Sequence, residues 1–252
     1  MEKPLDGQTV LVTGATGGLG ASIVTQLAAD GARPIIHYNR DIAKAEALLK
    51  RIDGRGSVLR CELSSPGSAL ELWSRAIQAE GRIHGLVNNA GIRTEITIDA
   101  SPEEWRLAWL KEFQVNLFAA ADLCREAIKH FKENGGGRIV NMASRAAQRG
   151  YAANAMPYGA SKAALANLTK SIARSYGAEG VTAVNIAPGW VLTDMAEDYV
   201  ATHGISAAVA DIPIGKMAAP SEVAELVSFV LRPSQKSLNG ATLDVNGGSY
   251  IR

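Results

Sequence analysis

Short apolar runs alternate with longer amphipathic segments along the whole chain. Such runs are typical of strands buried on both faces of a parallel sheet. We predict seven strands, at Val10–Thr13, Pro34–Tyr38, Ser57–Arg60, Ile83–Asn88, Arg138–Ala143, Val181–Ala187 and Ala241–Val245. Helical spacing occupies the segments between them, among them Gly18–Asp30, Ile42–Arg51, Ser68–Glu80 and Met156–Tyr176. This alternation predicts an α/β fold, a Rossmann-like doubly wound sheet that is mostly parallel and has helices on both faces.

One further helix carries both a start and a stop signal. Ser101 is a capping residue, a proline follows it, and Glu104 stands three positions later, which together form a capping box. The helical pattern runs to about Lys132, and the Asn-Gly-Gly-Gly run at 134–137 ends it. We find no repeat, low-complexity tract or linker, so we expect residues 1–252 to form a single domain.

The stretch between Pro188 and Pro220 departs from the alternation of strands and helices. It contains several glycines and prolines and many small residues. Because it follows a strand of an open sheet, it is either a substrate lid around 188–220 or an ordinary surface excursion.

Composition narrows the class of protein. The chain has 252 residues, 47% of them hydrophobic and 20% charged, and its formal net charge is +1. This balance does not favour nucleic acid or an anionic membrane as partner, and no apolar run reaches the roughly 20 residues of a membrane span. The start at Met1 lacks the layout of a secretion signal. Cys61, Cys124 and four scattered histidines lack metal-ligand spacing, so we expect a cytoplasmic protein with buried thiols and no metal.

A glycine-rich turn, Thr13–Gly20, directly follows the first predicted strand and opens the first predicted helix. Glycine allows a tight turn and a close backbone approach, and the N–H groups of a helix start point toward a bound anion. At the first strand of an alternating chain, this turn predicts a site for the phosphates of a nucleotide.

A second group of residues carries potential acid–base chemistry. Tyr158 and Lys162 lie four positions apart and therefore share one face of a helix. A neighbouring ammonium group lowers the pKa of a phenol toward a working value. Such a pair is common by chance, but Ser144 and the run 88–91 (Asn-Asn-Ala-Gly) follow two predicted strands, and Asn116 lies in mid-helix.

Together with Thr13–Gly20 and the Pro-Gly pair at 188–189, this ordered set resembles the short-chain dehydrogenase/reductase family, in its short single-domain branch. The resemblance extends from Gly7 to about Gly248. It implies one catalytic domain that binds a nicotinamide dinucleotide and interconverts a carbonyl and a secondary alcohol. The implied catalytic roles are general acid or base for Tyr158, tuning of its pKa and binding of the nicotinamide ribose for Lys162, holding of the substrate oxygen for Ser144 and support of a water relay for Asn116.

The same resemblance implies a set of cofactor-binding residues. They are Gly14, Thr16, Gly18, Leu19, Gly20, Asn39, Arg40, Glu62, Leu63, Asn88, Ala90, Gly91, Tyr158, Lys162, Pro188, Gly189, Val191 and Thr193. Tyr38 stands where NAD-binding relatives usually carry an acid, and Arg40 suits a 2′-phosphate, so we favour NADP(H) over NAD(H). Gly17 departs from the basic residue of many NADP-binding relatives, and Arg40 is alternatively a solvated loop charge.

The substrate is a small carbonyl compound or alcohol whose identity the sequence leaves open. Arg93, Arg145 and Arg149 adjoin the motifs that border the expected cleft, so they either meet an anionic group of the substrate or face solvent. The resemblance implies the activity of a 3-oxoacyl-thioester reductase, a sugar dehydrogenase or another alcohol dehydrogenase. The loop after Gly91 lacks the pattern of a dedicated fatty-acid-synthesis reductase.

Two rival functions and one assembly state follow from the same resemblance. A non-catalytic NAD(P)-sensing protein would usually have lost Tyr158 or Lys162, and an epimerase or dehydratase would usually carry an added C-terminal domain. The resemblance also implies a homo-oligomer, a tetramer or a dimer, assembled through the helices that carry Asn116 and Tyr158.

Overall fold

The computed structural model describes residues 3–252, apart from the side chains at positions 194, 195, 198 and 203. The first two residues of the segment that was expected to lack a secretion signal, from Met1, therefore lie outside the described residues, as does the side chain of His203. The strands are β1 (Thr9–Val12), β2 (Arg33–Tyr38), β3 (Ser57–Arg60), β4 (Gly85–Asn88), β5 (Gly137–Met142), β6 (Val181–Pro188) and β7 (Thr242–Val245). The longer helices are α1 (Gly18–Ala29), α2 (Ile42–Arg51), α3 (Ser68–Glu80), α4 (Pro102–Phe113), α5 (Ala119–Glu133), α7 (Met156–Tyr176), α8 (Asp194–His203) and α10 (Pro220–Leu231). Shorter turns are the π-helix η1 (Gln114–Phe118), α6 (Ala146–Arg149), α9 (Ile205–Val209) and the 3-10 helices η2 (Ala153–Ala155), η3 (Gly177–Glu179) and η4 (Lys236–Leu238).

The strands form one seven-stranded sheet in the order β3-β2-β1-β4-β5-β6-β7. Every adjacent pair is parallel, so the sheet is fully parallel where the sequence predicts a mostly parallel one. The doubly wound fold is confirmed, and each predicted strand ends within two residues of the observed one. The chain reverses its direction of winding between β1 and β4, which is where such sheets open a ligand crevice.

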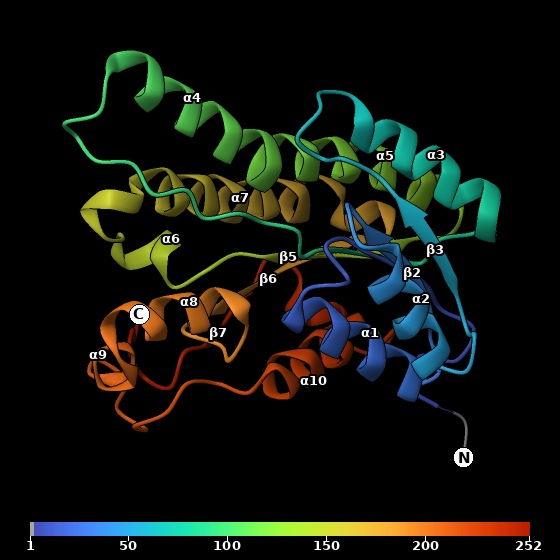
Figure 1. Cartoon of the computed structure of the whole chain (residues 1–252). Coiled ribbons are helices and arrows are strands. Elements are labelled where there is room, and N and C mark those ends of the chain that lie inside the picture. Colours follow the sequence, from blue (N-terminus) through green and yellow to red (C-terminus); the bar gives the residue numbers. More distant parts are fainter. Residues whose placement is uncertain (1–2) are drawn as a thin grey trace.

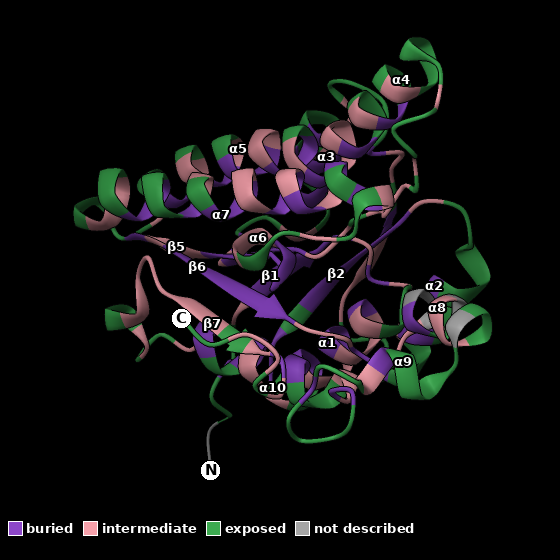
Figure 2. Ribbon diagram, turned by 90° about the vertical axis from the view of Figure 1, so that its left-hand side faces the viewer, coloured by how far each residue is buried: buried purple, intermediate pink, exposed green. Residues whose placement is uncertain are grey.

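Helices cover both faces of the sheet (Figure 1), with α1, α2 and α10 on one side and α3, α5 and α7 on the other. The strands are buried on both faces because successive side chains point into different cores. In β1, Val10 and Val12 pack in the core under α1 and α10, whereas Leu11 packs in the core under α3 and α5. Figure 2 shows the buried strands between these two layers.

The long predicted helix is interrupted rather than uniform. Its capping box is confirmed: Ser101 Oγ accepts the Glu104 amide at 3.2 Å, and Glu104 Oε2 accepts the Ser101 amide at 3.0 Å. Between α4 and α5 the chain forms η1, one π-helical stretch that contains Asn116. A π-turn adds a residue to the helix and recurs at functional sites.

A row of asparagines crosses the middle of the sheet. Asn88, Asn141 and Asn185 pair in register on β4, β5 and β6. Asn88 Nδ2 donates to Asn141 Oδ1 at 2.8 Å, and Asn141 Nδ2 donates to Thr169 Oγ1 of α7 at 2.7 Å. Thr169 Oγ1 in turn donates to Asn185 Oδ1 at 2.7 Å. All four side chains are buried, so the row is a polar network inside an otherwise apolar core.

The 188–220 segment contains α8 and α9, which lie beyond the carboxyl ends of the strands and next to the C-terminus (Figure 1). Ala196, Ala208, Ile212 and Met217 form a small core of their own there. A parallel bridge from Val191 to Ala218 closes the base of the segment.

Two smaller expectations concern cysteines and membranes. Both cysteines are free thiols; Cys124 is buried as predicted, whereas Cys61 is partly exposed. No helix among the described residues has the length and apolar character needed to cross a bilayer.

Candidate active site

A cavity of about 660 Å³ lies at the carboxyl ends of the strands, where the chain changes its direction of winding. Loops after β1 to β6 contribute its walls, so residues far apart in sequence meet there. The predicted site residues that line it are Gly14, Thr16, Gly18, Leu19, Gly20, Asn39, Arg40, Glu62, Leu63, Ala90, Gly91, Ser144, Tyr158, Lys162, Pro188, Gly189, Val191 and Thr193. One continuous cleft therefore joins the glycine turn to the Tyr158–Lys162 pair.

Two predicted residues lie behind this wall. Asn88 is buried in the asparagine row and also donates to Cys124 Sγ at 3.3 Å. Its neighbour Asn89, which the sequence analysis did not select, donates from Nδ2 to Thr13 O at 2.9 Å and to Gly14 O at 3.1 Å. Asn89 thus ties the end of β4 to the glycine turn. Asn116 is also buried and reaches the site through its hydrogen bonds.

The glycine turn has the geometry that a dinucleotide pyrophosphate needs. Gly14 has φ +61°, a left-handed conformation that glycine adopts without strain. A Cβ at Gly20 would overlap the carbonyl oxygen of Gly14, so only glycine lets α1 pack this closely on the turn. The helix begins after Gly17 with no side-chain cap and no acid in its first turn, which leaves its N-terminal N–H groups directed at the cavity.

A buried histidine forms a hydrogen bond to the backbone of this turn. His37 Nδ1 accepts the Gly14 amide at 3.0 Å, and its Nε2 lies 3.1 Å from Cys61 O. Burial lowers the pKa of His37 to about 4, so the ring is neutral at pH 7 and Nδ1 is free to accept. The four histidines are scattered along the sequence, and only the position of His37 near the end of β2 indicates that it could reach the glycine turn.

Opposite charges gather at the far end of the cleft, beside β2 and β3. Ser64 Oγ donates to Glu62 Oε1 at 2.7 Å. This bond, a hydrogen bond from Asn39 and the charge of Arg40 hold the pKa of Glu62 below its usual value. Arg40 itself is exposed, and Tyr38 is buried. This end of the cleft therefore carries one acidic and one basic side chain, Glu62 and Arg40. The first could accept hydrogen bonds from a ribose, and the second could bind a 2′-phosphate.

At the other end, Tyr158, Ser144 and Lys162 converge. Lys162 Nζ donates to Met142 O at 2.7 Å and lies 5.9 Å from the centre of the Tyr158 ring. Burial lowers the pKa of Lys162 to about 8, opposed by the charge of Glu112. Burial also raises the pKa of Tyr158 to about 12, although the Ser144 hydroxyl bonds to it and acts in the opposite direction. The groups that lower the pKa of Tyr158 are Ser144 and Arg93, and burial outweighs both, so the expected lowering by Lys162 is not seen.

Asn116 links a buried carboxylate to this centre. Its Nδ2 lies 2.9 Å from Ile92 O, 2.9 Å from Glu112 Oε1 and 3.1 Å from Ser161 Oγ. Its Oδ1 accepts the Ile92 amide at 2.8 Å. A Cβ built on Gly91 would lie 3.2 Å from Lys162 Nζ and 3.3 Å from Asn116 Oδ1, so both groups border the same small space.

Glu112 is a further candidate site residue, beyond those that the sequence predicted. It is fully buried, and its Oε2 accepts the Thr94 amide at 2.7 Å. Burial raises its pKa, while Thr94, Asn116 and the charge of Lys162 act in the opposite direction. Its spacing four positions before Asn116 was the available signal, because residues four apart share a helix face.

The three candidate arginines lie beside this centre. Arg145 lines the main cavity and also a second cavity, which Arg93 and Arg149 help to line. Arg93 pairs with Glu95 at 2.7 Å, and Arg145 and Arg149 both contact Asp211. Only Arg145 therefore borders the main cleft, and each of the three arginines has a carboxylate partner.

The chain is similar to known proteins over nearly its whole length. A family model described as "Enoyl-(Acyl carrier protein) reductase" matches residues 14–250. The chain is 33% identical to the 3-oxoacyl-[acyl-carrier-protein] reductase FabG of Vibrio cholerae over 98% of this chain and 99% of that protein. It is 32% identical to an NADPH-dependent aldehyde reductase-like protein of Arabidopsis thaliana, over 97% of this chain and 95% of that protein.

Among solved structures, a putative gluconate dehydrogenase from Agrobacterium tumefaciens superposes with a TM-score of 0.90 at 27% identity, and 98% of each chain is covered. Sequence and structure thus match the same kind of protein over nearly the full length. The chain belongs to the short-chain dehydrogenase/reductase family of oxidoreductases.

Proposed function

We propose that this protein is an NADP(H)-dependent reductase that interconverts a carbonyl and a secondary alcohol, with Tyr158 as proton donor or acceptor. The observation that carries the proposal is the meeting of Tyr158, Ser144 and Lys162 in one cleft with the glycine turn. The turn accounts for a dinucleotide, and the three side chains account for the proton transfer that must accompany hydride transfer.

In the direction of reduction, the Tyr158 phenol donates its proton to the carbonyl oxygen as that oxygen gains negative charge. Its raised pKa, about 12, means that the phenol holds this proton at neutral pH. Ser144 donates a hydrogen bond to the same oxygen and so stabilises the developing charge. Lys162 returns a proton to the Tyr158 phenolate, and a water relay that Asn116 supports through its side-chain amide would restore the proton of Lys162 from solvent. The oxidation of an alcohol reverses each step.

The nicotinamide dinucleotide, when bound, supplies or accepts the hydride. The uncapped start of α1 at Gly18 would hold its pyrophosphate. Asn39 and Arg40 would hold the adenosine ribose, and the guanidinium group of Arg40 favours the 2′-phosphate of NADP(H) over NAD(H). Ala90, Gly91, Pro188, Gly189, Val191 and Thr193 would line the remaining length of the cofactor, as their places in the cavity wall support.

Two substrate classes have support from relatives. FabG of Vibrio cholerae acts on 3-oxoacyl groups carried by acyl carrier protein, as its name states. The structural relative from Agrobacterium tumefaciens is described as a putative gluconate dehydrogenase, which favours a sugar acid. The 188–220 segment would form a lid over either substrate, because Val191 and Thr193 line the cleft and α8 follows them directly.

We further propose that residues 1–252 act as one catalytic domain within a homodimer or homotetramer. Leu107 and Leu110 of α4 and Phe118 of η1 are large apolar side chains that stay 46–58% exposed. A second copy of the chain would cover this face. Light scattering coupled to size-exclusion chromatography measures the number of subunits.

The test is a scan of carbonyl compounds with NADPH and with NADH, followed at 340 nm, on the wild type and two variants. Tyr158→Phe removes only the hydroxyl, and we expect turnover to fall by at least about 10²-fold while NADPH still binds. Tyr176→Phe, on the same helix α7, is the matched control and should keep wild-type turnover. Near-normal turnover in Tyr158→Phe would refute the assigned role. Cofactor binding without turnover of any substrate would favour a sensing protein instead.

A further inference from the structure

A second cavity, about 590 Å³ in volume, adjoins the proposed active site. Arg145, Tyr151 and Trp190 line both cavities, so the two share a wall. Among the described side chains of the second cavity, three arginines face two carboxylates, those of Glu95 and Asp211. The cavity wall therefore carries one net positive charge, which would attract a monoanion.

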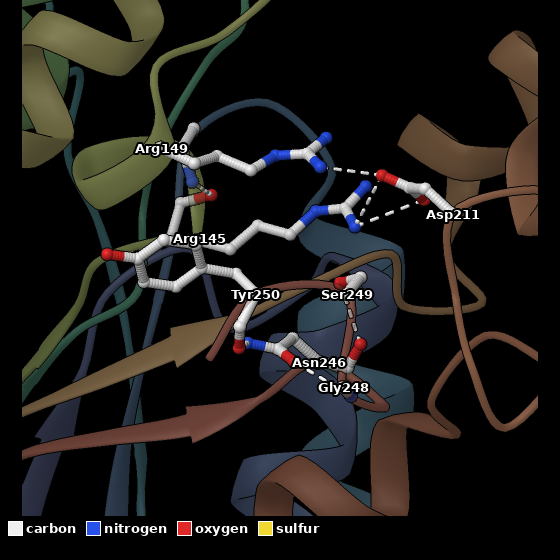
Figure 3. A network of polar contacts seen from close by, with 9 residues as sticks. Arg145, Arg149, Asp211, Asn246, Gly248, Ser249 and Tyr250 are labelled. Carbon is white, nitrogen blue, oxygen red and sulfur yellow. Dashed lines mark hydrogen bonds and ion pairs between the residues drawn. The ribbon is translucent and has the colours of Figure 1, made fainter. Parts of the chain in front are cut away.

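Two of these arginines hold one carboxylate between them (Figure 3). Arg145 Nη1 donates to Asp211 Oδ1 at 3.3 Å and to Oδ2 at 3.1 Å, and Arg149 Nη1 donates to Oδ2 at 2.6 Å. The Arg145 side chain is only 4% exposed, whereas that of Asp211 is 43% exposed. The guanidinium group of Arg145 is thus part of the buried cavity wall, and the carboxylate of Asp211 contacts it from the side that faces solvent.

The carboxylate and the arginines come from different parts of the fold. Arg145 and Arg149 follow β5 around α6, whereas Asp211 lies just after α9 in the 188–220 segment. Burial lowers the pKa of Arg145, Arg149 lowers it further, and Asp211 raises it. A buried guanidinium therefore needs an anion at this point, but it does not need this particular carboxylate.

The position of the arginine pair fits a substrate. Arg145 directly follows Ser144, and the ring of Tyr151 lies 5.3 Å from the ring of Tyr158. An anion held by Arg145 and Arg149 would therefore lie in the cavity that shares Arg145 and Tyr151 with the cleft of Ser144 and Tyr158.

We propose that Arg145 and Arg149 form a subsite for the carboxylate of an oxo-acid or hydroxy-acid substrate, and that Asp211 fills this subsite until the substrate replaces it. The inference rests on the proposed function and adds the substrate class to it. A carboxylate matches the subsite because the same two donors already hold the carboxylate of Asp211. A substrate with one carboxylate would replace it without changing the charge held by the two arginines. Arginine donors suit the planar carboxylate geometry.

The rival explanation is a structural latch that merely fastens the 188–220 segment. Opposite substitutions separate the two. Under the subsite proposal, Arg149→Gln removes a donor to the substrate, whereas Asp211→Asn removes its competitor. Under the latch explanation both variants break the same contact and act in the same direction.

The experiment compares kcat/KM for a series of oxo acids of increasing chain length with that for their methyl esters. We expect the acid-to-ester ratio to fall about 10- to 100-fold in Arg149→Gln, as for loss of a charge-assisted hydrogen bond, and to rise several-fold in Asp211→Asn. Lys132→Gln removes an equal charge from a surface ion pair with Glu179 and should leave the ratio unchanged. The chain length with the largest ratio reports the spacing between carboxylate and carbonyl.

A second measurement does not depend on turnover. Propionate, a monocarboxylate with no ketone to reduce, should raise the thermal unfolding midpoint of the wild type and of Asp211→Asn, with a smaller rise in Arg149→Gln. Equal losses with acids and esters, or a fall of the ratio in Asp211→Asn, would overturn the subsite. Reduction of neutral carbonyls but not of any oxo acid would overturn it too, while the proposed function would stand. Failure with every carbonyl would instead overturn the proposed function.

Discussion

Replacement of Gly20 by alanine tests whether close packing of α1 on the glycine turn builds the cofactor site. The added Cβ would overlap Gly14 O and lie 2.8 Å from Ala15 Cα and 2.9 Å from Asn89 Nδ2. Two of these neighbours are backbone atoms, so a side-chain rotation cannot relieve the crowding. Either the turn or the whole helix must move.

The cost follows from the contacts that such a movement breaks. Gly14 O accepts hydrogen bonds from Asn89 Nδ2 at 3.1 Å and from the Gly17 amide at 3.3 Å. Overpacking costs about 1–3 kcal/mol, and each lost hydrogen bond costs about 1 kcal/mol. The better helix propensity of alanine returns about 1 kcal/mol. We therefore expect Gly20→Ala to lower the free energy of unfolding by about 2–4 kcal/mol.

The assay combines thermal unfolding with a fluorescence titration of NADPH. At about 2–4 °C per kcal/mol for a chain of this size, the unfolding midpoint should fall by about 4–16 °C. The Kd for NADPH should rise at least about tenfold, which corresponds to 1.4 kcal/mol, because the N–H groups of α1 leave their positions.

Gly17→Ala is the matched control in the same turn. Gly17 has φ −75°, and its added Cβ would meet only Gly14 O, at 3.6 Å. We expect it to stay within about 1 kcal/mol of the wild type, since alanine is merely a poorer N-cap than glycine. If Gly20→Ala unfolds like the wild type and binds NADPH normally, the reasoning from backbone crowding is refuted.

Two further predictions concern pH. Glu112→Gln removes the negative charge that raises the pKa of Lys162, so above the pKa of Glu112 the upper pH limit of kcat for reduction should move down by about one unit. Coincident pH profiles for this variant and the wild type would contradict the role of Glu112. The pKa of His37 falls from 6.5 in the unfolded chain to about 4 in the fold, so the unfolded chain binds the proton first as pH falls. The wild type should therefore lose about 2 kcal/mol between pH 7 and pH 5 relative to His37→Gln in urea unfolding, and equal losses would contradict this.

The sequence predicted the sheet well because each strand is a short apolar run bounded by polar or glycine residues. The predicted strand at Ile83–Asn88 starts two residues early, since Ile83 is as buried as the strand but lies just before it. The break between α4 and α5 was not predictable from periodicity. A π-turn shifts the pattern by one residue, which a short window cannot distinguish from a broad apolar face.

The candidate site was predictable where chemistry and chain position coincide, as for Ser144, Tyr158 and Lys162. Glu112 was missed because an acid in a helix is usually read as exposed, and only the fold shows that it is fully buried. Asp211 was missed because 62 positions separate it from Arg149. No periodic pattern in the sequence indicates that the 188–220 segment contacts the chain after β5. The pKa of Tyr158 is raised because the side chain is buried, and the spacing of residues in the sequence does not reveal that burial.

The asparagine row has a consequence for how the strands find their alignment during folding. The central strands are apolar on both faces, so a slip by two residues would exchange one aliphatic side chain for another at little cost. The same slip would separate Asn88, Asn141 and Asn185 and leave buried amides without partners, at about 1–3 kcal/mol each. The alignment of β4, β5 and β6 is thus selected by polar matching inside the sheet. The loops after these strands carry Gly91, Ser144 and Gly189, so a slip in register would also shift the walls of the cleft. The cost of the unpaired amides therefore disfavours misfolded chains in which these walls are misaligned.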